Sequence, residues 1–418
     1  MASADLNAQL LSRATRPTLA SKILFFLLLS GPPKFRLRDP SASLNDEIDW
    51  VIVLQLIVWG VAGCWVLLNY LYRRHEDKAR DQRFSSLSML SSLLVALLSL
   101  SIFISEAPSF SAFKIYQLAI TSAFVMLFTK RFGIDETLNN LFLGCGILTL
   151  ADIVAAFVMP HLVFVESELG SMRFRGDLIA QTGCVSVIGL LLLLTVKSDI
   201  SRKQFVFWAM TFGSVLAFSL MRTSYLILLA VFVLSAVRRP AIAVLRRVST
   251  IVLLALPFVA DMLMSALNAQ RKAEDIWTLS ERAGLWSYLV ETTLDRGPYL
   301  GLGYFAASRI YAPEFNPNLG TAHSAFMEVY AGGGCVALIA LLLMWVVLGW
   351  KVMRLYFSRP GKTGFAIVAL FCAALFLNAM GGELQADPAG FCFWCVVAAM
   401  ALFSRSVFVG RLPLSSIH

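Results

Sequence analysis

The sequence has few charged residues and leaves no room for a soluble domain between its apolar segments. Only 15% of its 418 residues are Asp, Glu, Lys or Arg, whereas 58% are hydrophobic, and the mean hydropathy is +0.74. Soluble domains are usually about half apolar and about a quarter charged. Here, runs long enough or nearly long enough to cross a hydrocarbon core recur along the whole chain. We therefore predict a polytopic, all-α membrane protein that forms one integral membrane domain over residues 1–418.

The apolar segments predict about twelve transmembrane helices. They cover residues 18–29, 51–72, 87–105, 115–129, 138–160, 178–196, 205–220, 225–237, 250–266, 326–350, 365–380 and 389–403. Several are short for a straight span, which indicates tilt, shared turns or a thinner local bilayer. The first run follows basic residues, as in a signal peptide, but no small-residue cleavage site follows it. We interpret it as the first helix.

Positive charge gathers in the loops on one side of the predicted bundle. With a cytoplasmic N-terminus, every predicted inner loop is basic, and most Asp and Glu residues fall outside or at the outer membrane edge. The basic inner loops are 73–83, 130–131, 197–203, 238–247 and 351–362. This is the bias that sets the orientation of membrane proteins. The net charge of +9 therefore indicates topology and not a nucleic-acid partner.

The seven cysteines do not form the framework of a disulfide-rich protein, because all lie in or at the ends of apolar segments. Cys392 and Cys395 have CxxC spacing, but no His or acidic residue lies beside them. We interpret them as small residues packed within the membrane, and not as a redox or metal pair. The sequence predicts no metal site and no cofactor.

One predicted connection is long, and it lies outside. Residues 266–322 form this outer loop, and long structured loops usually carry function. Residues 268–293 are rich in helix formers, and their large apolar side chains fall at roughly helical spacing, namely Trp277, Leu279, Leu285, Trp286, Leu289 and Val290. They predict an amphipathic helix on the membrane surface. Residues 295–320 are rich in Gly, Pro and Asn and predict irregular structure.

Four arginines on the predicted outer side are candidates for function. Arg222 lies in the short link 221–224 between two apolar helices, where a charge costs free energy and is a functional candidate. Arg173, Arg175 and Arg282 lie in the outer segments. Each could instead bind a lipid phosphate, a helix carbonyl or a nearby acid. Because several guanidinium groups face one side and arginine matches phosphate geometry, they suit a diphosphate on a lipid.

His323 lies where the long loop meets the next apolar helix. Thr321 or Ser324 could cap that helix and place His323 in its first turn. The helix dipole would then favour the neutral imidazole, which accepts a proton; a structural role is the alternative. Glu328 is an acid in an apolar span, either a paired structural group or coupled to His323. The glycines at 332–334 do not form a nucleotide loop and are expected to bend a helix or let helices approach.

Several short motifs, taken in order, resemble the O-antigen ligase and Wzy-type polymerase family of bacterial surface-polysaccharide assembly. They are SEAPSFS (105–111), RFRG (173–176), MRTS (221–224), SER followed by Trp286 (280–286), PYLGLGYF (298–305), and HSAFME (323–328) before the glycine cluster. The resemblance covers roughly residues 90–350. Two positions depart from the family pattern. Ser324 replaces the usual Asn after the histidine, and IAQT (179–182) follows where the family has a Pro-Asn pair.

The resemblance implies a fold related to C-type glycosyltransferases and a metal-independent glycosyl transfer at the periplasmic face of the bacterial inner membrane. The donor is a glycan on undecaprenyl diphosphate. His323, Arg222 and Arg282 would be catalytic, and substrate would be bound by Arg173, Arg175, Gly303 and Glu328. Membrane lipids, a flippase and a chain-length regulator are the expected partners.

We favour an exopolysaccharide-type polymerase, because the 105–111 segment looks more like that branch. A ligase that transfers the glycan to lipid A core is the nearest alternative. A lipid or sugar transporter and a non-catalytic assembly partner are two further alternatives.

Overall fold

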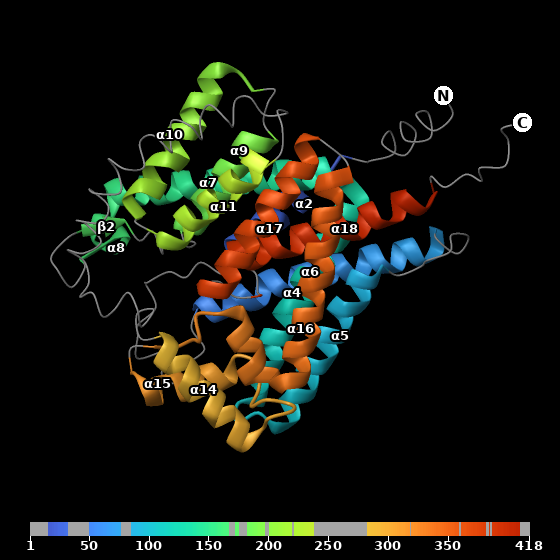
Figure 1. Ribbon diagram of the computed structural model, residues 1–418, viewed down its shortest axis with the longest axis vertical. Coiled ribbons are helices and arrows are strands. Elements are labelled where there is room, and N and C mark those ends of the chain that lie inside the picture. Colours follow the sequence, from blue (N-terminus) through green and yellow to red (C-terminus); the bar gives the residue numbers. More distant parts are fainter. Residues whose placement is uncertain are drawn as a thin grey trace, which may run out of the picture.

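The computed structural model of the protein is built almost entirely from helices (Figure 1). The structure describes residues 16–31, 50–76, 85–166, 172–174, 182–196, 200–219, 221–237, 282–317, 319–358, 361–381, 384 and 387–409. The elements are α2 (Leu19–Ser30), α4 (Trp50–Glu76), α5 (Ser86–Leu100), η2 (Ser101–Ile104), α6 (Pro108–Phe132), α7 (Ile134–Val158), α8 (Pro160–Val163), β1 (Phe164–Glu166), β2 (Met172–Phe174), α9 (Thr182–Thr195), α10 (Arg202–Ser219), α11 (Arg222–Val237), α14 (Arg282–Arg296), α15 (Ala306–Phe315), α16 (Ala325–Ser358), α17 (Lys362–Met380) and α18 (Pro388–Val409).

Six helices in the described residues are long and apolar enough to cross a membrane. They span Ile52–Leu71, Ser86–Ile104, Pro108–Phe132, Ile134–Val158, Ala325–Ser358 and Lys362–Met380. Four shorter apolar helices coincide with other predicted spans, at Leu19–Ser30, Thr182–Thr195, Thr223–Leu234 and Pro388–Phe403. Helix α10 falls in neither group, and the predicted span 250–266 lies outside the described residues. The prediction of a helical protein with several membrane-crossing helices is confirmed, and the number twelve stays a prediction.

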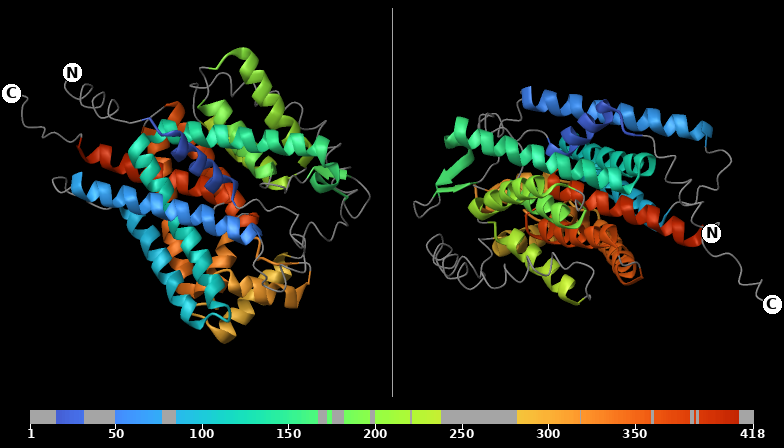
Figure 2. Two further views of the ribbon diagram at one scale, coloured as in Figure 1. Left: turned by 180° about the vertical axis from the view of Figure 1, so that it is seen from behind. Right: turned by 90° about the horizontal axis from the view of Figure 1, so that it is seen from above.

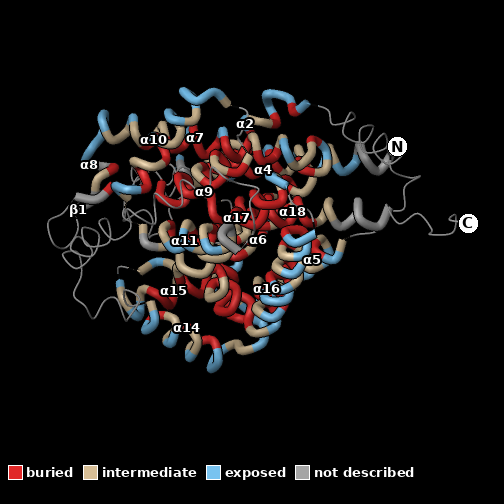
Figure 3. The backbone as a smooth tube through the Cα atoms, turned by 45° about the horizontal axis from the view of Figure 1, so that its top comes forward, coloured by how far each residue is buried: buried red, intermediate tan, exposed pale blue. Residues whose placement is uncertain are grey.

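The core lies where α17 and α18 pack against each other and against α6, α9 and α16. Figure 3 shows these central helices as the most deeply buried part of the chain. Large aromatic side chains such as Phe391, Phe393 and Trp394 fill this region. By contrast, α4 and α5 expose many apolar side chains, which is the pattern expected of surfaces that face lipid. Figure 2 shows α4 at the edge of the molecule.

A small hairpin interrupts the helical pattern. Strands β1 and β2 pair antiparallel, with Phe164 opposite Phe174. The two rings meet edge to face with centroids 5.5 Å apart, and Phe174 packs with Val163 and Val215. The sequence predicts no strand here, because segments of three residues carry too little alternation of apolar and polar side chains.

Helix α14 falls within the segment predicted to be an amphipathic helix. Residues 282–293 are helical as predicted and the helix continues to Arg296, whereas residues 268–281 lie outside the described part. The buried side chains Leu285 and Leu289 pack in a cluster with Tyr311 and Ala331. The side of this helix that carries Leu285 and Leu289 packs against α15 and α16, and its position on the membrane surface stays a prediction.

Helix α15 corrects the prediction of irregular structure over residues 295–320. It contains Pro313 and is flanked by glycine and asparagine, which hid it in the composition. Its Tyr311 and Ala312 are buried against α14 and α16. Tertiary packing thus stabilises a helix that local propensity does not favour.

Candidate active site

Helix α16 is broken by the glycine cluster close to its start. Gly334 has φ 68° and ψ −170°, which is not helical. The backbone of the segment 298–303 fills the break, because Leu302 N donates to Ala331 O (2.8 Å) and Gly303 N donates to Gly332 O (3.1 Å). Cys335 N in turn donates to Pro298 O (2.9 Å). The predicted bend is confirmed, and the close approach is made by a loop and not by a second helix.

Only glycine permits this contact. A Cβ at Gly301 would overlap the backbone of Gly332 and Gly333, and one at Gly334 would overlap the backbone of Tyr299. Gly301 and Gly334 also have positive φ angles, 70° and 68°, which L side chains rarely adopt. The two glycine motifs, more than thirty residues apart, therefore fit together as one unit.

Gly303 joins this unit to the corner between α5 and α6. Its φ is 104°, and a Cβ there would overlap Ser105 Oγ and come within 2.8 Å of Ser111 Oγ. These two hydroxyls lie 2.9 Å apart, and Ser101 Oγ accepts a hydrogen bond from Tyr304 N (3.3 Å). Gly303 is buried, and its predicted role in binding substrate stays a prediction.

His323 lies two residues before α16, in a tight turn. Its φ is 52°, in the left-handed region, so the prediction that it occupies the first helical turn is wrong. A left-handed residue cannot continue a right-handed helix, and α16 begins only at Ala325. The ring is half-buried, and its Nδ1 lies 3.4 Å from Thr321 Oγ1. Non-glycine residues in this conformation are uncommon, and they gather at functional sites.

The residues on either side of His323 are held by three helices. Trp286 Nε1 of α14 donates to Ala322 O (2.8 Å), and Ala322 N donates to Glu328 Oε1 (2.7 Å). The backbone N–H of Glu328 donates to Ser324 O (2.9 Å). Glu328 was predicted to bind substrate, but it is only 1% exposed. Its second carboxylate oxygen, Oε2, accepts from Ser308 Oγ of α15 (2.7 Å).

Arg282 is the first residue of α14, and its guanidinium donates a hydrogen bond to the main-chain carbonyl of Met380, the last residue of α17. Arg222 is the first residue of α11, and its side chain lies outside the described part of the structure. The start of α11 is anchored by Ser224, whose Oγ donates to Gly183 O (3.2 Å). Both arginines therefore begin helices that reach α17, since α11 packs along it.

The other two predicted arginines are not described at the level of side chains. Arg173 is a backbone partner in β2, opposite Val165, and Arg175 lies outside the described residues. Of the predicted site residues, the structure thus brings Gly303, His323 and Glu328 into one packed unit with the helix that begins at Arg282.

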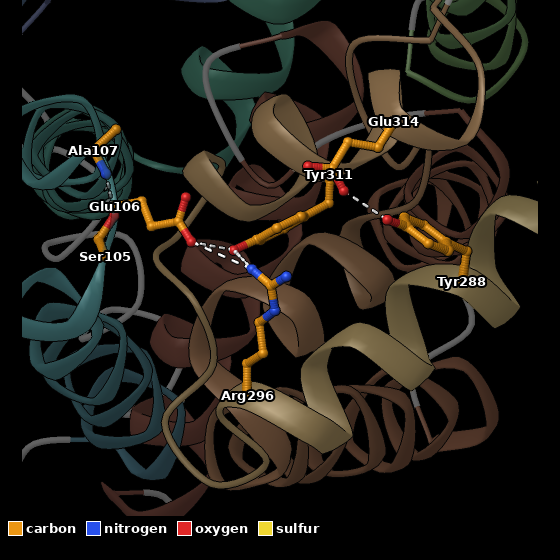
Figure 4. A network of polar contacts seen from close by, with 7 residues as sticks. All are labelled: Ser105, Glu106, Ala107, Tyr288, Arg296, Tyr311 and Glu314. Atoms are coloured by element: carbon orange, nitrogen blue, oxygen red, sulfur yellow. Dashed lines mark hydrogen bonds and ion pairs between the residues drawn. The ribbon is translucent and has the colours of Figure 1, made fainter.

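A polar network that the sequence analysis missed lies between the 105–107 segment and helices α14 and α15 (Figure 4). Tyr311 donates to the Glu106 carboxylate and accepts from Arg296 Nη1 (2.9 Å), and Arg296 and Glu106 form an ion pair at 3.6 Å. Tyr288 donates to Glu314 Oε2 (2.6 Å). No local spacing rule connects these residues, because Glu106 and Tyr311 are 205 positions apart.

This network changes the acidity of its members. Burial and the hydrogen bond to Glu106 raise the pKa of the Tyr311 phenol above its usual value. The hydrogen bond to Glu314 does the same for the pKa of Tyr288. The phenols therefore stay protonated, and able to donate, over the whole physiological range.

Two further cations lie on aromatic rings at the start of α6 and on α15. Arg309 Cζ is 4.7 Å from the Phe110 ring centroid, and Lys114 Nζ is 5.5 Å from the same centroid. Lys114 also lies 5.3 Å from the Phe305 ring. Ring contacts of this kind attract a cation and hold its side chain in place.

Among the residues that the structure describes, no group of three or more His, Cys, Asp or Glu side chains could hold a metal ion. All seven cysteines are free thiols. We compared the sequence with models of protein families and with curated proteins, and neither comparison gave a match. The family suggested by the motifs therefore stays a prediction.

Proposed function

We propose that this protein is a metal-independent glycosyltransferase that polymerises undecaprenyl-diphosphate-linked oligosaccharide repeat units into exopolysaccharide or O-antigen. The reaction would take place at the periplasmic face of the bacterial inner membrane. One observation supports this proposal above all. Motifs at 105–111, 298–305 and 323–334, which are far apart in the sequence, pack into one unit beside the left-handed turn of His323.

The proposed reaction is a single displacement at the anomeric carbon of the donor glycan. The acceptor hydroxyl oxygen forms a new bond to this carbon, and His323 takes the hydroxyl proton. The bond between the anomeric carbon and the diphosphate oxygen breaks, and its electron pair leaves with the lipid diphosphate. Arg222 and Arg282 would bind the leaving diphosphate, because guanidinium groups match its oxygens and stabilise developing charge. A positioned base typically contributes about 100- to 10,000-fold in rate.

The contact between His323 and Thr321 suits this role. When Nδ1–H donates to Thr321 Oγ1, the lone pair lies on Nε2, which then accepts the proton.

Three alternative functions predict different experimental results for this protein. A ligase would perform the same displacement with lipid A core as the acceptor. A lipid or sugar transporter would tolerate the loss of His323, because no proton is abstracted. A non-catalytic assembly partner would form no polymer when purified and supplied with lipid-linked repeat units.

The test uses purified protein and synthetic lipid-diphosphate-linked repeat units, with products sized on a gel. We expect His323→Ala, Arg222→Ala and Arg282→Ala each to lower the rate of chain growth by about 100-fold or more. His161→Ala is the matched control, because this histidine is exposed on α8, and it should retain full activity. Normal polymer from the His323 and Arg222 variants would refute the assignment.

A deletion strain distinguishes a polymerase from a ligase. Lipid carrying single repeat units would indicate a missing polymerase, whereas full-length chains that never leave the lipid would indicate a missing ligase.

A further inference from the structure

Ala322, the residue directly before His323, is fixed on both sides by side chains from other parts of the chain. Trp286 Nε1 binds its carbonyl oxygen at 2.8 Å, and Glu328 Oε1 accepts from its N–H at 2.7 Å. Ala322 itself is fully buried. The carbonyl bound by Trp286 belongs to the peptide that leads into His323, and the N–H that donates to Glu328 belongs to the peptide before that one.

The residue after His323 is fixed as well. Ser324 O accepts from the backbone N–H of Glu328 at 2.9 Å, and Ser324 is buried. Glu328 thus contacts the chain on both sides of His323, once with its side chain and once through the first main-chain hydrogen bond of α16. Trp286 fixes the peptide plane directly before His323, and the Glu328 contacts fix the next peptide outward on each side. Together these bonds restrict the turn that holds the left-handed conformation, which costs free energy.

Glu328 is itself oriented by a third element. Its Oε2 accepts from Ser308 Oγ at 2.7 Å, and Ser308 is fully buried on α15. Both carboxylate oxygens are therefore bound to donors of the protein, and the side chain is directed inward. This arrangement does not suit direct contact with a substrate.

We infer that Trp286 and Glu328 are positioning residues, which clamp Ala322 and so aim the imidazole of His323 at the acceptor hydroxyl. This inference rests on the proposed function. It assigns to Trp286 a role beyond its packing, and it gives Glu328 a mechanical role in place of substrate binding. Trp286 lies on α14 and binds the peptide between Ala322 and His323. The packing of α14 therefore affects the direction of the His323 imidazole.

The test measures kcat and KM for the lipid-linked donor with purified protein. We expect Trp286→Phe and Glu328→Ala to lower kcat roughly 10- to 100-fold, because a small misplacement of a catalytic group costs this much. KM for the donor should stay close to the wild-type value. Tyr288→Phe, on the same helix but bonded to Glu314, is the matched control and should keep the wild-type kcat.

Glu328→Gln tests whether Glu328 acts through its hydrogen bonds or through its negative charge. A glutamine retains an acceptor for the Ala322 N–H, and Ser308 Oγ can donate instead to Phe305 O, which lies 3.3 Å away. We therefore expect Glu328→Gln to recover most of the activity that Glu328→Ala loses. An inactive glutamine variant that folds normally would overturn the inference, because it would show that the negative charge is needed.

The same substitutions in a His323→Ala background supply the decisive comparison. If Trp286 and Glu328 act only through His323, their removal causes no further loss once the imidazole is absent. Full additional losses in that background would mean a general structural role and would overturn the inference. An inactive wild type, or a fully active His323→Ala, would instead refute the proposed function. If Glu328→Ala does not fold, Trp286→Phe and Glu328→Gln still decide the question.

Discussion

Tyr311 binds two groups of opposite charge with one hydroxyl. It donates to Glu106 and accepts from Arg296, and the Arg296 guanidinium also lies over its ring at 5.0 Å. Three segments meet in these contacts, namely the corner between α5 and α6 and the helices α14 and α15. The phenol therefore links the two sides of the candidate site.

We expect Tyr311→Phe to lower the stability of the detergent-solubilised protein by about 1 kcal/mol at neutral pH, the usual contribution of a lost hydrogen bond. The pH dependence should change too. Because the pKa of Tyr311 is raised in the folded state, its stabilising effect is present at lower pH and is lost as pH rises above about 10. The thermal midpoint of the wild type should then fall more steeply in this alkaline range than that of Tyr311→Phe.

Tyr299→Phe is the control for this measurement, because Tyr299 is 70% exposed and its loss should leave the thermal midpoint unchanged. Parallel alkaline slopes for the wild type and Tyr311→Phe would contradict the assigned role of the phenol.

At the residue scale, the sequence predicts which side chains to examine but not their geometry. The motif points to His323, but it does not reveal the left-handed backbone of this residue. Nor does it reveal the bond from Trp286 to the Ala322 carbonyl, which lies 36 residues later. The pairing of Glu106 with Tyr311 and Arg296 is set by the folded chain, and no periodicity reveals it.

At the scale of elements, the break in α16 is the feature on which the site is built. The helix breaks at Gly334, and the backbone groups of the cluster bind the segment 298–303. Any side chain at Gly334 would meet the backbone of Tyr299, which cannot move away as a flexible side chain could.

We expect Gly334→Ala to destabilise the protein by about 1–3 kcal/mol, the usual cost of a non-glycine residue in strained backbone, with the added cost of the clash. Gly213→Ala in α10 is the matched control. Gly213 is helical, and a Cβ there would meet nothing within 4 Å, so alanine should be neutral or stabilise by about 0.5–1 kcal/mol. Thermal midpoints of the two variants in detergent provide the measurement, and equal midpoints would show that the break in α16 tolerates a side chain.

Helices with a strong apolar pattern can be predicted from the sequence. Helices that are stabilised mainly by packing against other parts of the chain cannot. The glycine cluster at 332–334 was expected to bend a helix, and the structure confirms this. Helix α15 was missed, because Pro313 and the flanking glycines outweigh its short helical pattern. Its stability comes from Tyr311 and Ala312, which are buried against neighbouring helices.

At the scale of the whole molecule, six apolar helices of spanning length were found in the described residues, in agreement with the predicted class of fold. Hydropathy identifies these helices because a segment that crosses the bilayer must be long and apolar. The polar groups of its backbone must also be hydrogen-bonded within the protein. It does not reveal that α17 and α18 are the centre of the protein, since both helices are as apolar as those at the edge.

The proposed orientation can be tested with introduced cysteines in a Cys64→Ser background, because Cys64 is the exposed native thiol. Asp295→Cys on α14 and Gly361→Cys between α16 and α17 both replace exposed residues. We expect a membrane-impermeant maleimide to label Asp295→Cys in spheroplasts, because the basic inner loops fix the opposite side in the cytoplasm. Gly361→Cys should be labelled only in inverted vesicles, and the reverse pattern would mean that the protein is inserted the other way round.

The hydrogen bond between Arg282 and Met380 has a consequence for biosynthesis. Its partners are 98 positions apart, so the ribosome must complete α17 before Arg282 can meet its acceptor. Membrane domains emerge from the N-terminus onward during synthesis. A nascent chain that carries α14, α15 and α16 would thus already hold His323 and its clamp, while one of its proposed diphosphate ligands still lacked its anchor. Until the C-terminal helices are in the membrane, the order of translation would therefore leave the Arg282 guanidinium without this main-chain acceptor.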